Sequence, residues 1–80
     1  MFEEVRDIVC QTLQLGGRCE SLVPSTQLLG NLPELDSMAV VSIITALEEY
    51  YGFVVHDDEI SGETFATLGS LVAFVEAKLA

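Results

Sequence analysis

Apolar residues recur at helical spacing in three segments of this chain, and this repetition restricts the fold more than any other feature of the sequence. The segments cover residues 2–15, 37–51 and 68–79. In each, apolar residues three or four positions apart lie on one side of a helix. Such helices bury their apolar sides by packing together, so the sequence predicts an all-α bundle. The expected inward residues are Phe2, Val5, Val9 and Leu13; Val40, Ile43, Leu47 and Tyr50; and Leu68, Leu71, Val72, Val75 and Leu79.

The residues between these helices predict a long loop and one short helix. Gly16 and Gly17 end the first helix, and the stretch up to residue 35 is rich in residues that disfavour helices, so we expect a loop there. Its apolar residues Leu22, Val23, Leu28, Leu29 and Leu32 are expected to hold it to the core. Residues 56–63, HDDEISGE, predict a short helix with Ile60 directed inward. The expected fold is one domain over residues 1–80, a small four-helix bundle with three main helices, one short helix and a long first loop.

Acidic residues dominate the charge of the chain. Thirteen acids against three basic residues give a net charge of -10. This charge repels the phosphates of nucleic acids and anionic membrane surfaces, and it attracts proteins with basic patches. No apolar run is long enough to cross a bilayer, and the N-terminal residues are acidic where a signal peptide is basic. We therefore expect a cytoplasmic monomer that binds neither nucleic acid nor membrane, with basic docking patches on its protein partners.

The two cysteines, Cys10 and Cys19, are nine positions apart. They form no CxxC pattern, and no histidine is placed to complete a zinc site with them. The cytoplasm keeps thiols reduced. We therefore expect two free thiols without a specific role.

Polar residues suited to capping precede the second and the last helix. Thr67 precedes the last helix, and Asp36 suits the N-cap of the second, where its carboxylate can accept a hydrogen bond from a first-turn amide. Because Asp36 can cap, the hydroxyl of Ser37 is left free at the positive end of the helix dipole, which suits an attached phosphate. A hydrolytic nucleophile is not supported, since His56 is the only histidine and nothing supplies a base and an orienting third group.

From Leu28 to Leu47 the chain reads LLGNLPELDSMAVVSIITAL, and EEYYGFVVHDDEI follows. With the amphipathic last helix, this sequence resembles the acyl carrier proteins over nearly the whole chain. The resemblance implies a four-helix bundle with a short third helix. It also implies that Ser37 bears 4'-phosphopantetheine, attached from coenzyme A by a separate phosphopantetheinyl transferase that uses magnesium. Asp36 is then the acid that the transferase and the capping both need, and Met38 is the apolar contact that follows.

The implied function is that of a carrier. The thiol of the arm holds acyl cargo as a thioester and presents it to acyl-loading and acyl-transfer enzymes. An enzyme is disfavoured because no paired general acid and base, no phosphate-binding glycine loop and no metal-ligand spacing is found. The stretch LPELDSMAVVSIITALEE also resembles stand-alone carriers linked with bacterial exosortase and exopolysaccharide systems. Two alternatives stay open: an aminoacyl or peptidyl carrier, although the peptidyl type usually has histidine in place of Asp36, and an acidic helical adaptor without a prosthetic group.

The second helix departs from the carriers of fatty acid synthesis. Glu34 stands where those carriers usually have glycine, and the exposed positions of the helix are uncharged. Exposed apolar residues with an acidic rim favour a docking patch, and its partners are expected to differ from the housekeeping synthase enzymes. The alternative is that the long loop buries Val41. The expected docking face is Met38, Val41, Ser42 and Thr45, ringed by Glu34, Asp36, Glu48 and Glu49.

Three further hypotheses concern the second half of the chain. The acids Asp57, Asp58, Glu59 and Glu63 lack EF-hand spacing and are interpreted as a helix start rather than a cation site. His56 beside them is either an exposed loop residue or a pH-sensitive latch. An acyl chain could fold back into a cleft between the second and last helices. The residues expected to line this cleft are Val40, Ile44, Phe53, Leu68 and Leu71.

Overall fold

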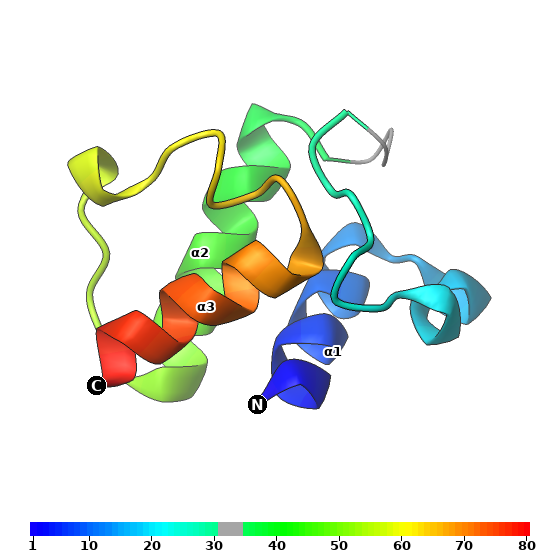
Figure 1. Cartoon of the computed structure of the whole chain (residues 1–80), viewed down its shortest axis with the longest axis horizontal. Helices are drawn as coiled ribbons and strands as arrows, with labels where there is room; N and C mark the ends of the chain where they lie inside the picture. Colours follow the sequence, from blue (N-terminus) through cyan, green and yellow to red (C-terminus); the bar gives the residue numbers. More distant parts are fainter. Residues whose placement is uncertain (31–34) are drawn as a thin grey trace.

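The computed structural model describes residues 1–30 and 35–80. Three long helices, α1 (Phe2–Leu13), α2 (Ser37–Tyr51) and α3 (Leu68–Leu79), pack around one core (Figure 1). A short 3-10 helix, η2 (Asp57–Glu59), lies between α2 and α3, so the predicted bundle of three main helices and one short helix is confirmed. A second 3-10 helix, η1 (Gly16–Ser21), lies in the first loop and was not predicted. Within the described residues no helix is long and apolar enough to span a bilayer.

The ends of the helices follow from particular residues. α1 ends before the two glycines, because Gln14 adopts the left-handed conformation with φ 55° and its amide donates to the carbonyl of Cys10. α2 ends at Gly52, whose φ of 77° suits a residue without a side chain. α3 begins at a reciprocal cap in which Thr67 and Ser70 each accept the other's amide at 3.0 Å, which confirms the predicted Thr67 cap.

The core lies between the three helices and takes in five residues from the connecting segments: Leu15, Leu22, Leu28, Leu35 and Phe65. Tyr50 and Leu79, both predicted to face inward, are 60% and 44% exposed. Tyr51 takes the inward position instead of Tyr50, because successive residues of a helix point about 100° apart and the stripe continues four positions after Leu47. Leu79 is the last residue of α3, and the core ends at Val75. The largest fully buried side chains are Phe65, Leu28, Ile43, Leu47, Leu68, Leu71, Val5, Val9 and Val75.

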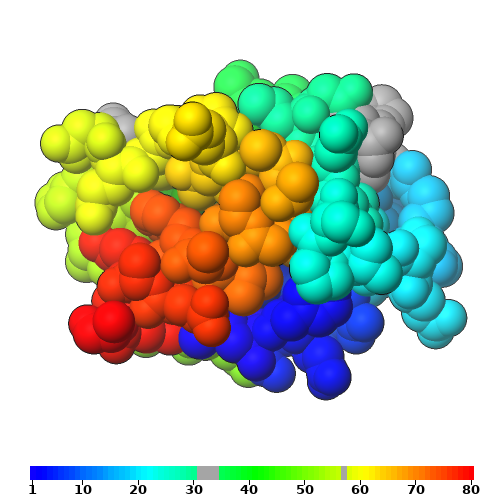
Figure 2. Space-filling view, viewed as in Figure 1, coloured from blue at the N-terminus to red at the C-terminus, as the bar shows by residue number. Residues whose placement is uncertain are grey.

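The first loop is held by backbone hydrogen bonds as well as by apolar contacts. Leu22 and Leu28 are buried as predicted, whereas Val23 and Leu29 are about half exposed and Leu32 lies outside the described residues. The loop instead pairs with the residues that lead into α3, which adjoin it in Figure 2. A Cβ at Gly69 would lie 2.9 Å from a loop carbonyl, so only glycine permits this approach. The four bonds join Leu28 to Ala66, Leu29 to Phe65, Leu68 to Thr26 and Gly69 to Pro24.

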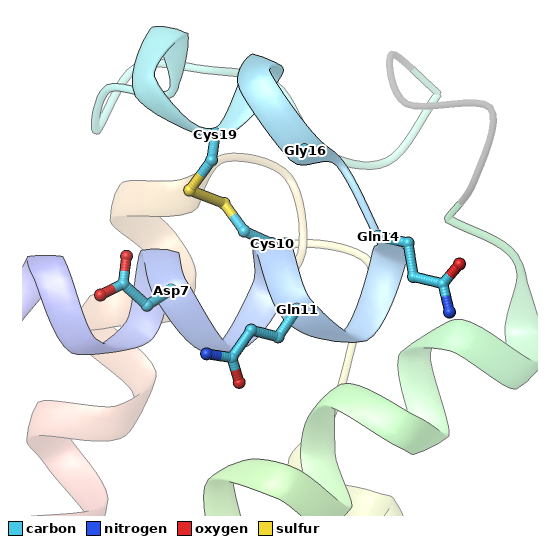
Figure 3. Close-up of a pocket in the computed structure, with 6 residues that line it drawn as sticks. All are labelled: Asp7, Cys10, Gln11, Gln14, Gly16 and Cys19. Atoms are coloured by element: carbon cyan, nitrogen blue, oxygen red, sulfur yellow. A yellow bond between two sulfur atoms is a disulfide. The ribbon is translucent and has the colours of Figure 1, made fainter.

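A disulfide joins Cys10 of α1 to Cys19 of η1, so the expectation of two free thiols is wrong for this structure (Figure 3). The two Cα atoms are 5.6 Å apart. The reason is the unpredicted helix η1, which turns the chain back beside α1 after the left-handed Gln14 and brings Cys19 to Cys10. None of the residues of η1 is fully buried, but the residues at its two ends, Leu15 and Leu22, are buried in the core.

Reduction of this disulfide should lower the stability of the protein. A bond that closes a loop of this length removes unfolded-chain entropy equivalent to about 2–3 kcal/mol. We therefore expect urea unfolding in dithiothreitol to show a free energy of unfolding lower by about that amount. A Cys10→Ala/Cys19→Ala variant is the control, because the reductant should leave it unchanged. Equal unfolding midpoints for oxidised and reduced wild type would show that the bond contributes nothing.

Candidate functional site

The site begins at the residue that caps α2. Asp36 has an extended backbone, and its Oδ1 accepts a hydrogen bond from the amide of Ala39 at 2.8 Å. Its carbonyl accepts the amide of Val40 at 2.9 Å, the first bond of the helix. The preceding Leu35 is buried and anchors the chain on the core side. The predicted capping role of Asp36 is therefore confirmed.

Ser37 is the first helical residue, and its side chain is exposed. The first amides of a helix have no acceptor within it, and together with the helix dipole they favour a negative group at this end. A phosphodiester on the Ser37 hydroxyl would lie in water beside this positive end, and no core contact would be lost. The residues present therefore fit an attached phosphopantetheine arm.

The predicted docking face is exposed along α2. Met38 is 75% and Val41 is 63% exposed, so the loop does not bury Val41. Ser42 and Thr45 are exposed as well. Exposed apolar side chains of this size beside the start of α2 form a surface to which a partner can bind.

The structure describes three of the four acids predicted to ring this face. Glu48 is half-buried, and its Oε2 accepts the amide of Val55 at 2.7 Å, so this carboxylate ties α2 to the following segment. Glu49 is exposed but lies beside Tyr50, toward α1. Asp36 is exposed, and one of its carboxylate oxygens accepts the cap hydrogen bond from Ala39. Glu34 lies outside the described residues.

An apolar groove of about 180 Å³ runs along α2. Val40 and Ile44 line it as predicted, but Phe53, Leu68 and Leu71 do not, and the last two are fully buried in the core. The second wall of the groove is the segment after α2 rather than α3. The lining residues are Val40, Val41, Ile44, Thr45, Glu48, Val55 and Ile60.

The other polar clusters give no comparable site. The ring of His56 is exposed, while its backbone amide donates to Glu59 at 2.7 Å. In the part of the chain that the structure describes, no three His, Cys, Asp or Glu side chains gather closely enough to hold a metal ion. A wide hollow of about 390 Å³ lies at the disulfide, and Figure 3 shows the side chains around it. Its two sulfur atoms are bonded to each other, so neither is a free thiol.

Comparisons with known proteins agree with this site. Residues 3–75 match the family described as the phosphopantetheine attachment site. An acyl carrier protein of Campylobacter hominis is 30% identical over 76 residues, which are 95% of this chain and 90% of that protein. The solution NMR structure of a holo acyl carrier protein from Nitrosomonas europaea is 63% identical with a TM-score of 0.90, over 98% of this chain and 94% of that chain.

The chain therefore belongs to the phosphopantetheine-bearing family of acyl carrier proteins. The predicted class is confirmed: the protein carries acyl groups on a covalent 4'-phosphopantetheine arm and is a carrier rather than a catalyst. The alternative of an adaptor without a prosthetic group is set aside by the same findings.

Loss of the cap should destabilise the helix that bears Ser37. Replacement of an N-cap aspartate by alanine costs about 1 kcal/mol, because a first-turn amide loses its acceptor. We expect Asp36→Ala to lower the free energy of unfolding by that amount in urea titrations. Asp36→Asn is the matched control, since an asparagine caps equally well without the charge. An equal loss in both variants would mean that the charge of Asp36, rather than its hydrogen bond, stabilises α2.

Proposed function

We propose that Ser37 bears the phosphopantetheine arm and that the chain presents acyl thioesters on it to enzymes with basic docking patches. The observation that carries this proposal is the exposed hydroxyl at the first residue of α2, directly after a capping aspartate. Ser42 is also exposed on α2, but it lies inside the helix, where the backbone amides are already used. Only at Ser37 does an exposed hydroxyl on α2 coincide with the positive end of the helix.

The attachment reaction transfers the 4'-phosphopantetheinyl group from coenzyme A to Ser37. The serine Oγ forms a bond to the phosphorus that bears pantetheine, and the pyrophosphate P–O bond of coenzyme A breaks. Adenosine 3',5'-bisphosphate leaves, and the hydroxyl proton passes to a base. This chain supplies the acceptor oxygen and the helix end beside it. We assign the base and the magnesium to the phosphopantetheinyl transferase.

The same face of α2 is proposed to receive the partners. Met38 and Val41 supply exposed apolar contact. The net charge of -10 speeds the approach of basic surfaces, while apolar contact extends the lifetime of the complex. The transferase is one such partner, and acyl-loading and acyl-transfer enzymes are the others. The link to exosortase or exopolysaccharide systems and to partners outside the housekeeping synthase stays a prediction.

We also propose that the carrier works as a cytoplasmic monomer. Its charge opposes association between copies of the chain. In the cytoplasm the bond between Cys10 and Cys19 would meet reducing conditions. The reduced protein is then the form that partners encounter there. The free energy of unfolding of the reduced form, rather than that of the oxidised form, therefore applies in the cell.

The attachment residue can be identified by intact mass after incubation with coenzyme A, magnesium and a promiscuous phosphopantetheinyl transferase. We expect wild type and Ser42→Ala to gain the mass of one phosphopantetheinyl group and Ser37→Ala to gain none. Ser37→Ala should keep its helical circular dichroism, because the exposed hydroxyl is outside the core. Full modification of Ser37→Ala, or its loss in Ser42→Ala alone, would move the attachment away from Ser37.

A further inference from the structure

Residues 53–60, here named the strap, form one wall of the apolar groove on α2. Val55 and Ile60 of the strap face Val41 and Ile44 of α2 across the groove. Phe53, Val55 and Ile60 of the strap are half-buried against the core, whereas Val54 is 65% exposed and His56 is exposed too. A segment whose inward side chains are only half-buried depends in part on its polar contacts to stay in place.

Two carboxylates hold the two wall residues of the strap. Glu48 accepts the amide of Val55 at 2.7 Å and so fixes the first wall residue to α2. Glu59, directly before Ile60, accepts the amide of His56 at 2.7 Å with one oxygen and binds the ammonium of Lys78 at 2.8 Å with the other. The position of Ile60 is thus tied through Glu59 to the last turn of α3.

Basic residues such as Lys78 are scarce in this chain. Ten acidic residues follow Arg18 in the sequence, and Lys78 is the only lysine or arginine that does so. Its ammonium pairs with Glu59 of η2, nineteen positions away. The pKa of Glu59 is lowered, first by the hydrogen bond from the His56 amide and then by Lys78, so this carboxylate is charged near neutral pH.

The groove begins close to the residue proposed to bear the arm. Val40, Val41 and Ile44 follow Ser37 by three, four and seven positions, so all four lie on one side of α2. A rise of about 1.5 Å per residue puts the first of them only one turn away. An acyl chain carried on the arm is therefore at high effective concentration beside the groove. At about 180 Å³ the groove is smaller than the ~300 Å³ of ordinary ligand pockets, so a long chain needs it to widen.

We propose that the ion pair between Glu59 and Lys78 is a latch that holds the strap closed and limits access of the carried acyl chain to this groove. The role of the latch in cargo access rests on the proposed attachment at Ser37. The closure of the strap does not, because it concerns the fold of the apo protein.

Amide hydrogen exchange of the apo protein tests the latch without any arm. In Lys78→Met, which keeps an apolar stem but removes the charge, we expect the hydrogen-bonded amides of His56 and Glu59 to exchange about two- to five-fold faster, the change expected for loss of a partly exposed ion pair. Leu71 and Val75 in the core of α3 should keep their wild-type rates. Glu59→Gln should resemble Lys78→Met, and Lys78→Arg should restore the slow rates.

Two controls separate the latch from a general effect of charge. Arg6→Met changes the net charge by the same amount on α1 and should leave the strap at wild-type rates. About 1 M salt, which shortens the electrostatic screening length to ~3 Å, should speed the exchange of the Glu59 amide in wild type but hardly in Lys78→Met. Equal strap exchange in wild type and Lys78→Met, or faster exchange in Arg6→Met as well, would overturn the latch.

The effect on cargo is measured on protein that bears an octanoyl group on the arm. In Lys78→Met we expect octanoylation to shift the methyl NMR signals of Ile44 and Ile60 more than in wild type, because the chain reaches a wider groove. Equal shifts in the two proteins would overturn the link between latch and cargo. Failure to load either protein would instead contradict the attachment at Ser37, so the two proposals fail in different ways.

Discussion

The hydrogen bond from the Ala39 amide to the Asp36 carboxylate sets the start of α2, and most of the functional surface depends on where that helix starts. Residues of a helix follow one another at about 100°, so the apolar stripe of α2 sets which side chains face inward, and the cap makes Ser37 the first residue of the helix. With Asp36 as the cap, Ile43 and Leu47 enter the core while Ser37 faces water.

Acidic side chains act in this protein as acceptors for the backbone as well as surface charges. Asp36, Glu48 and Glu59 accept the amides of Ala39, Val55 and His56 at 2.8, 2.7 and 2.7 Å. Each of these amides lies in the first turn of a helix or in the segment after α2, where a regular backbone acceptor is lacking. A chain with three basic residues has few salt bridges available, so backbone amides take their place. Of these three contacts, the one between Glu48 and Val55 joins α2 to the strap, and the other two are local caps.

The sequence was sufficient for the features that arise from local patterns. Apolar spacing predicted the three helices, and Asp36 and Thr67 were recognisable as caps from their chemistry and position. The predictions that were wrong or missing involve contacts between distant segments. No periodic signal indicates that the first loop pairs with the residues before α3, that η1 brings Cys19 to Cys10, or that Glu48 turns from the rim to Val55. The groove was placed against α3 for the same reason, since sequence spacing says which side of a helix is apolar but not which segment covers it.

The most direct test of this account is a comparison of amide NMR spectra of the apo and holo proteins. If the arm extends from the capped end of α2 into water, the shift changes should centre on Ser37, Met38 and Ala39, while the core residues Leu47 and Val75 keep their signals. A perturbation centred on another element, or one that moves the amides of Ile43 and Leu47 as α2 changes its packing, would contradict the account.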